Sequence, residues 1–127
     1  MKTISKDLQE KSSLEIAKML ANAALEKKAE DLKILNVKTI SSFTDYFVIM
    51  SGRSTRHVKG LAEAVDAELR KKNRIKASNT EGLNEGQWVL LDYNDVVVHI
   101  FYRETRKFYD LENLWHDAEK IPVNNET

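Results

Sequence analysis

The 127-residue sequence contains no cysteine, a single proline and only four glycines. Without cysteine the chain can form no disulfide or zinc–thiolate site, and it offers no thiol nucleophile. It also lacks an apolar run close to the roughly 20 residues that cross a bilayer, and its polar first residues are unlike a signal peptide. We therefore expect a cytoplasmic protein that does not associate with membranes.

The sequence also lacks an excess of positive or negative charge. Its 20 lysines and arginines balance 20 aspartates and glutamates, which gives a formal net charge of +0. Proteins that hold nucleic acid by its phosphates usually carry a basic excess, so a neutral chain favours a protein partner. No row of aromatic residues alternates with the densest basic group, which is Lys71, Lys72, Arg74 and Lys76. We interpret this group as a solvated helix end that makes at most a minor RNA contact.

The clearest local pattern lies near the middle of the chain. Residues 46–50, YFVIM, are an unbroken apolar run rich in β-branched and aromatic side chains, which predicts a strand covered on both faces. The turn Ser51-Gly52 ends this strand, and an amphipathic helix with an N-cap at Ser54 or Thr55 follows it. We expect the rest of the chain to be organised around this unit.

Weaker patterns define the other elements of one domain over residues 12–121, between a flexible arm at 1–11 and a flexible tail at 122–127. Apolar periodicity predicts helices over 13–28 and 108–121 and strands over 32–37, 74–78, 88–92 and 96–102. The first of these strands should pair antiparallel with the central one, because the loop between them is short. These elements predict an α/β domain with a mixed β-sheet of about five strands and helices packed on it.

Two stretches resemble a known family. Residues 44–58, TDYFVIMSGRSTRHV, and residues 81–118, EGLNEGQWVLLDYNDVVVHIFYRETRKFYDLENLWHDA, are similar to the ribosomal silencing factor family, also called Iojap, and only the ends of the chain fall outside the resemblance. The resemblance implies a translation repressor that binds ribosomal protein 14 of the large ribosomal subunit and hinders its joining to the small subunit. A minor RNA contact would then be with ribosomal RNA, and a homodimer of the free protein is left open.

The strands predicted at 88–92 and 96–102 form a hairpin whose side chains alternate between two faces. One face is almost purely aliphatic and suits packing against a helix. The other has the mixed composition of an interface centre: Trp88, Leu90, Asp92, Val97, His99 and Phe101. The residues alone leave two interpretations open, a core face covered by the C-terminal helix or a partner surface. The resemblance favours the partner surface, for which we predict contacts at Trp88, Leu90, Asp92, His99, Phe101 and Tyr109.

Metal-binding and catalytic patterns are weak. The only histidines, His57, His99 and His116, are not spaced as helix metal ligands are, and we predict no metal site and no cofactor. His99 and Asp92 share a hairpin face. No nucleophile is evident beside them, so we interpret the two as a structural hydrogen-bonded pair.

The turn at residues 51–55, SGRST, precedes a helix N-terminus, which favours anions. The alternative function is therefore a nucleotidyltransferase-like enzyme or a nucleotide-binding protein that uses this turn. Such an enzyme also needs two carboxylates at alternate strand positions to hold metal ions. Residues 74–78 contain no acid, and Asp92 and Asp95 are three positions apart across a turn. We predict a nucleotidyltransferase-like topology without the catalytic carboxylates, and no enzymatic activity.

Overall fold

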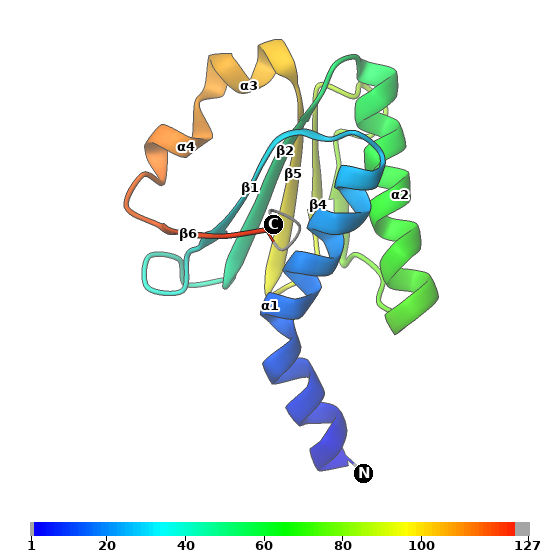
Figure 1. The fold of residues 1–127 in the computed structure, drawn as a ribbon, viewed down its shortest axis with the longest axis vertical. Helices are drawn as coiled ribbons and strands as arrows, with labels where there is room; N and C mark the ends of the chain where they lie inside the picture. The colour runs from blue at the N-terminus through cyan, green and yellow to red at the C-terminus, as the bar shows by residue number, and fades with distance from the viewer. Residues whose placement is uncertain (1, 124–127) are drawn as a thin grey trace.

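A computed structural model describes residues 2–123, and the side chains of this range apart from 2–12, 73 and 112 (Figure 1). The helices are α1 (Lys2–Glu26), α2 (Thr55–Asn73), α3 (Arg103–Tyr109) and α4 (Leu111–Leu114). The strands are β1 (Glu30–Asn36), β2 (Tyr46–Gly52), β3 (Asn79–Glu81), β4 (Trp88–Asp92), β5 (Val96–Tyr102) and β6 (Glu119–Ile121). No helix in this range is long and apolar enough to cross a membrane.

The six strands form one sheet in the order β3-β4-β5-β2-β1-β6. The two central strands, β2 and β5, are parallel, whereas every other neighbouring pair is antiparallel. The predicted mixed α/β class is thus confirmed, with one strand more than expected. The hairpin strands begin and end where the sequence placed them, and β1 pairs antiparallel with β2 as predicted.

β2 occupies the centre of the sheet because its apolar side chains need to be buried on both faces. All seven of its residues are buried, as the apolar run predicted. The chain leaves the strand through Gly52 and enters α2 at once, and the Ser54 hydroxyl caps the helix by accepting a hydrogen bond from the His57 N–H at 3.0 Å. Ser54, the first of the two residues considered, is therefore the N-cap.

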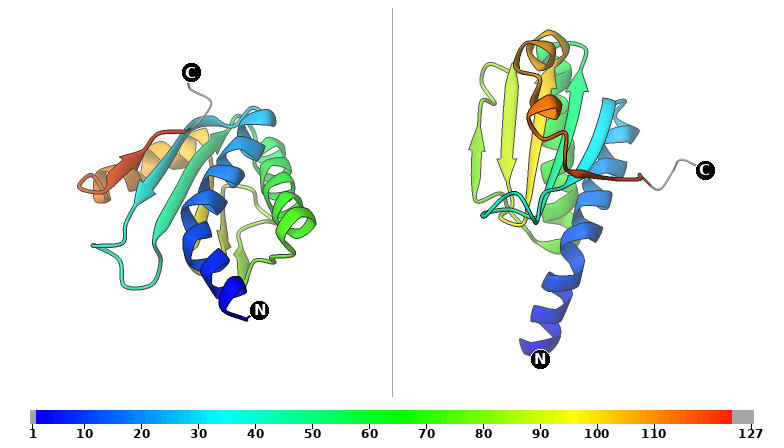
Figure 2. Two further views of the ribbon diagram at one scale, coloured as in Figure 1. Left: turned by 60° about the horizontal axis from the view of Figure 1, so that its bottom comes forward. Right: turned by 90° about the vertical axis from the view of Figure 1, so that its left-hand side faces the viewer.

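Apolar cores lie on both faces of the sheet. Helices α1 and α2 cover one face, and α3 and α4 lie on the other side (Figures 1 and 2). The first core is built from buried residues of α1, α2 and the sheet, among them Leu20, Ala24, Val48, Met50, Leu61, Val65, Val98 and Ile100. The second core is smaller, and Leu111 and Trp115 pack against its buried residues Leu35, Val37, Phe47, Ile49, Val97, Phe101 and Ala118.

The first helix differs from its prediction at its start. It begins at Lys2 rather than at residue 13, so the segment predicted as an arm at 1–11 is helical from Lys2 onward. The physical reason is propensity. Residues 2–11 contain no proline or glycine, and six of the ten are lysine, glutamate, glutamine or leucine, which favour a helix even without an apolar face. Of the predicted tail at 122–127, residues 124–127 lie outside the described residues.

The strand predicted at 74–78 is wrong in position. Arg74 instead ends α2 in the left-handed conformation, with φ 57°, and the strand that follows is Asn79–Glu81, paired antiparallel with β4 at the sheet edge. The sequence of this segment, Asn-Thr-Glu, shows no apolar period that would indicate a strand, and all three of its residues are exposed. Pairing with the backbone of β4, rather than burial of side chains, makes it a strand.

The single C-terminal helix predicted over 108–121 is also wrong. Asp110 adopts φ 50° and ends α3, with its N–H bonded to the Arg106 carbonyl at 2.8 Å. The chain then turns through the short α4 and pairs with β1 as strand β6. Leu111 and Trp115 do pack on the second core, so the helical spacing identified side chains that face the sheet but not the path between them.

Candidate protein-binding surface

The hairpin places the predicted contact residues on one face of the sheet. Trp88 lies opposite Phe101 across the β4–β5 pair, and Leu90 lies opposite His99. The other face carries Val89, Leu91, Val98 and Ile100, which belong to the first core. The predicted division of the hairpin into an aliphatic face and an aromatic face is therefore confirmed.

Aromatic rings run from this face out to the protein surface at the end of α3. The Trp88 ring stacks on Phe101 with centroids 4.8 Å apart, and its centroid lies 4.9 Å from that of the Tyr109 ring. Phe108 contacts Tyr109 at 5.1 Å. Tyr109 is 52% exposed and Phe108 is 80% exposed, while Trp88 is half-buried. We call Trp88, Phe108 and Tyr109 the aromatic surface.

The six predicted contact residues do not share one environment. Phe101 is completely buried and His99 is 6% exposed, so both lie beneath the surface and support Trp88 from below. The half-buried residues are Trp88, Leu90 and Asp92, and Tyr109 is exposed. The two interpretations left open by the sequence thus apply to different parts of one face: its inner part is core, and its outer part is accessible.

His99 is held in one protonation state and one tautomer. Burial lowers the pKa of His99 from 6.5 to about 4, so the imidazole is neutral near pH 7. Its Nδ1 accepts a hydrogen bond from the Trp88 indole Nε1 at 3.1 Å, which requires the ring proton to lie on Nε2. Nε2 is buried and has no hydrogen-bond partner among the described residues. A neutral, buried imidazole therefore orients the Trp88 indole.

Asp92 does not form the predicted pair with His99. Its Oδ1 accepts a hydrogen bond from the Asn94 N–H at 2.8 Å, which closes the turn of the hairpin. Asp92 lies opposite Val97, two positions from His99 along β5, and the Trp88 side chain takes the imidazole instead. The carboxylate serves the turn and has no part in a proton-transfer pair.

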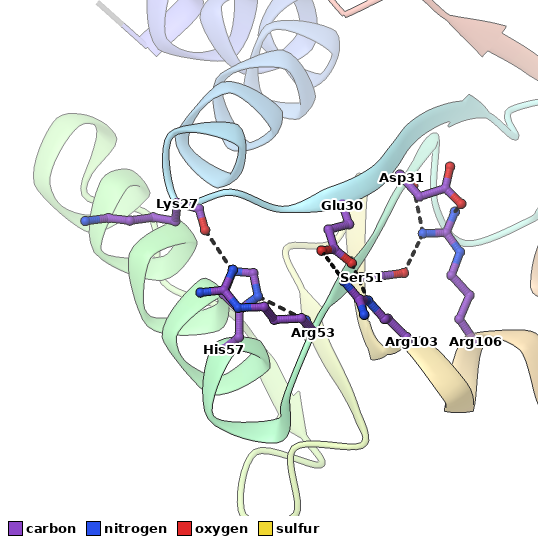
Figure 3. A network of polar contacts seen from close by, with 8 residues as sticks. All are labelled: Lys27, Glu30, Asp31, Ser51, Arg53, His57, Arg103 and Arg106. Atoms are coloured by element: carbon purple, nitrogen blue, oxygen red, sulfur yellow. Dashed lines mark hydrogen bonds and ion pairs between the residues drawn. The ribbon is translucent and has the colours of Figure 1, made fainter.

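Side chains of the SGRST turn and of α2 accept hydrogen bonds from backbone N–H groups that a bound phosphate would need. The Arg53 N–H donates to His57 Nδ1 at 3.1 Å (Figure 3). The His57 N–H donates to the Ser54 hydroxyl at 3.0 Å. On its other side His57 Nε2 bonds the Lys27 carbonyl at 2.8 Å, which ties the turn to the end of α1. Two of the N–H groups that an anion would need are thus already engaged.

The side chains that could bind a metal ion are not clustered in the described residues. Over the described part of the chain, no group of three or more histidine, aspartate and glutamate side chains is placed to hold a metal ion. The three histidines lie apart: His57 begins α2, His99 is in β5, and His116 follows α4.

Sequence reasoning missed Phe108 as a surface residue. Its helical spacing with Leu111 and Trp115 predicted a buried position, yet the turn at Asp110 directs it away from the core. Tyr109 was chosen because of the family resemblance. The sequence offers one signal, since two adjacent aromatic residues in a helix cannot both point straight into one core, so at least one of them must lie toward the surface.

The fold and this surface define a small mixed α/β domain that presents exposed aromatic side chains of the kind enriched at protein interfaces. A sequence model of the family described as "Ribosomal silencing factor during starvation" matches residues 10–127. The chain belongs to the ribosomal silencing factor family.

Similar proteins occur in bacteria and in plastids. The ribosomal silencing factor of Bacillus subtilis is 40% identical over 111 residues, which cover 87% of this chain and 91% of that protein. The chloroplastic Iojap protein of Zea mays is 32% identical over 115 residues, which cover 90% of this chain and 49% of that protein. A crystal structure of a Chromobacterium violaceum protein, 32% identical, superimposes with a TM-score of 0.78 over 87% of this chain and 91% of that one.

Proposed function

We propose that the protein represses translation by binding ribosomal protein 14 on the large ribosomal subunit and so blocking association with the small subunit. The observation that carries the proposal is the aromatic surface of Trp88, Phe108 and Tyr109, which stands on a rigid support and has accessible rings. Membership of the ribosomal silencing factor family supports the choice of the ribosome as the target.

The energetics of protein interfaces suit this surface. Tryptophan and tyrosine are enriched among the few residues that dominate binding energy, because they bury large areas and lose little side-chain entropy. Trp88 is already fixed by Phe101, Tyr109 and His99, so little further ordering is required when a partner binds. Leu90 and Asp92, on the same face, would lie toward the rim of the contact.

A shallow hollow adjoins the aromatic surface and provides polar groups beside it. It has a volume of about 370 Å³ and is lined by Gln87, Glu104, Thr105, Phe108 and Tyr109. The Thr105 hydroxyl and the Gln87 amide oxygen are hydrogen-bonded at 2.8 Å. An apolar centre with such polar groups beside it is the usual anatomy of a specific protein interface.

A steric block requires no chemistry from the protein. A domain of this size that occupies the joining surface of the large subunit excludes the small subunit as long as it stays bound. The nucleotidyltransferase-like alternative receives less support, because the SGRST turn is already engaged by His57 and Ser54. Contact with ribosomal RNA would be accessory, since Lys72 at the basic end of α2 is paired with Glu68 at 2.7 Å.

Sedimentation of isolated ribosomal subunits tests the proposal. Adding the protein should reduce the joined peak and place the protein with the large subunit, and Tyr109→Ala should weaken both effects. The matched control is Phe43→Ala, which removes an exposed aromatic ring from the loop between β1 and β2, at the other end of the sheet (Figure 1). Sedimentation with the small subunit alone would contradict the mechanism. The protein sedimented by itself tests separately whether the free chain forms a homodimer.

A further inference from the structure

Four exposed cationic side chains lie where α1 ends and α2 begins. Lys27 and Lys28 directly follow the last residue of α1, Arg53 precedes the N-cap of α2, and Arg56 is the second residue of that helix. The two segments are far apart in the sequence but lie side by side in the fold (Figure 1). We call these four residues the basic cluster.

His57 joins the two segments by bonding backbone atoms of both. Its Nδ1 accepts a hydrogen bond from the Arg53 N–H at 3.1 Å, and its Nε2 bonds the Lys27 carbonyl at 2.8 Å (Figure 3). Neither bond uses the cationic side chain of Lys27 or Arg53. Within the residues that the structure describes, no hydrogen bond or ion pair engages any of the four cationic side chains. The fold thus brings the charges together and leaves them accessible.

Two carboxylates near the basic cluster do not neutralise it. Glu30 is held by Arg103, whose Nε and Nη2 donate to its two carboxylate oxygens at 2.7 Å. This hydrogen bonding is the main cause that lowers the pKa of Glu30, and the charge of Arg53 adds to the lowering. Glu26 lines a separate hollow on α1 and α2, together with Lys72. The cluster therefore keeps an excess of positive charge on a chain that is neutral as a whole.

The two arginines occupy electrostatically unfavourable positions. A helix N-terminus carries a partial positive charge, which acidic side chains stabilise and cations oppose. Arg53 and Arg56 flank the N-cap Ser54, and the first turn of α2 contains no acid. Lys27 and Lys28 instead follow the C-terminus of α1, where cations are favourable. Helix stability therefore accounts for the two lysines but not for the two arginines, which favours a binding role for the arginines.

The composition of the basic cluster suits a phosphate backbone. None of the large apolar side chains that are exposed among the described residues belongs to it. A protein interface usually has an apolar centre, whereas lysine and arginine side chains without such a centre are the usual contacts of nucleic-acid phosphates. Two N–H groups of the neighbouring SGRST turn are already engaged, so the long side chains, rather than the turn, would reach the phosphates.

We propose that the basic cluster binds the phosphate backbone of RNA. Each of its four cations would contact one phosphate, without reading the base sequence. The choice of RNA among polyanions rests on the proposed function, since a protein bound to the large subunit lies beside ribosomal RNA. The basic group at the other end of α2 is less suited, because Lys72 there is paired with Glu68 at 2.7 Å. That group is visible in the sequence as one run, whereas the basic cluster is formed only by the fold.

Fluorescence anisotropy with a short RNA hairpin and the full-length protein tests the proposal. We expect saturable binding at low salt. The logarithm of the association constant should fall against the logarithm of the salt concentration with a slope of about −3, as four phosphate contacts give. Arg53→Gln combined with Arg56→Gln should weaken binding by about tenfold or more and bring the slope to about −1.5. Absence of saturable binding, or an unchanged affinity of this double variant, would overturn the proposal.

Lys71→Gln combined with Lys76→Gln is the matched control. Both lysines are exposed, they lie at or beyond the other end of α2, and the double substitution removes the same charge. The affinity for the hairpin should then change by less than about twofold, because salt screens distant charges. Equal losses in the two double variants would show that net charge alone attracts RNA, and the basic cluster would have no special role.

Two further measurements complete the test. The urea midpoint of the Arg53→Gln and Arg56→Gln double variant should equal or exceed that of the natural protein, because the substitutions remove cations from a helix N-terminus. A lower midpoint together with lost binding would make the arginines structural and overturn the proposal. Tighter binding of a polyglutamate peptide than of the hairpin would assign the cluster to an acidic protein segment instead of RNA. No ribosome enters these measurements, so their failure leaves the proposed repressor function untouched.

Discussion

The indole Nε1 of Trp88 donates a hydrogen bond to Nδ1 of His99 over 3.1 Å, from β4 to β5. The same indole stacks on Phe101, and Tyr109 contacts it from α3. A large, half-buried ring is thus fixed by one polar contact and two ring contacts. The buried residues of the sheet face thus contact the residue that solvent reaches. The position of Trp88 in the aromatic surface therefore depends on His99 and Phe101 in the core beneath it.

The Trp88–His99 hydrogen bond should be measurable as a coupling energy. Trp88→Phe keeps an aromatic ring and removes the N–H, whereas His99→Leu removes the acceptor and keeps an apolar side chain. In a double-mutant cycle on the free energy of unfolding, we expect a coupling of about 0.5–1.5 kcal/mol. Urea unfolding of the natural protein, both single variants and the double variant gives the value. Additive effects would show that the contact does not contribute to stability.

Protonation of His99 should destabilise the fold as the pH falls. Its pKa is about 4 in the folded state, against 6.5 ordinarily, because burial disfavours the charged form. Above pH 6.5 both states are neutral and stability is complete. Between pH 6.5 and 4 the unfolded chain takes up a proton that the folded chain excludes, so stability falls by about 1.4 kcal/mol per pH unit, to a total of about 3 kcal/mol.

Urea midpoints measured from pH 7 to 4.5 check this expectation, with His99→Leu as the reference. The variant retains the other titrating groups but lacks the imidazole, so its stability should decline less steeply over this range. Parallel curves for the two proteins would mean that His99 titrates normally in the folded state.

Local patterns predicted the hairpin, β2 and the cap of α2 because each depends on neighbours in sequence. The alternation of Val89 and Leu91 with Trp88 and Leu90 requires a two-faced strand. The run at residues 46–50 can be satisfied only by burial on both sides. For these elements the local pattern is enough to indicate the structure, although distant segments complete their pairing and burial.

The burial of Arg106 and the exposure of Phe108 depend on distant contacts and could not be predicted in this way. Arg106 is buried because Ser51 and Asp31, far away in the sequence, supply its acceptors. Similarly, Asp110 interrupts a sequence that has helical spacing on both sides, and the following chain gains backbone pairing with β1 instead. Spacing in the sequence shows which side chains face the sheet, but not where the backbone turns.

Gly82, in the turn between β3 and β4, should not tolerate a side chain. Its φ is 80°, and a Cβ there would lie 2.0 Å from the Trp88 carbonyl oxygen. Gly82→Ala should therefore lower the free energy of unfolding by about 1–3 kcal/mol. Gly60→Ala is the matched control: Gly60 lies within α2 and a Cβ meets nothing within 4 Å, so this substitution should stabilise by about 0.5–1 kcal/mol. Urea unfolding that shows no loss for Gly82→Ala would contradict the strained turn.

Phe108 and Phe43 provide a matched test of the aromatic surface. Both side chains are 80% exposed, so truncation of either to alanine should change the free energy of unfolding by no more than about 0.5 kcal/mol. Phe108 contacts Tyr109, whose ring lies against Trp88, whereas Phe43 lies in the loop between β1 and β2. If ribosomal protein 14 is the partner, as proposed, Phe108→Ala should weaken binding to the purified protein by about 1–2 kcal/mol, a factor of about 5–30 in the dissociation constant, and Phe43→Ala should leave it unchanged.

Calorimetric titration of each variant with ribosomal protein 14, beside its urea midpoint, separates binding from folding. A loss of affinity confined to Phe108→Ala, with both midpoints close to that of the natural protein, would assign the contact to the end of α3. If Phe43→Ala lost affinity and Phe108→Ala did not, the partner would bind at the opposite end of the sheet. Equal losses in the two variants would show that exposed aromatic rings contribute without regard to position, and the aromatic surface would then have no special role.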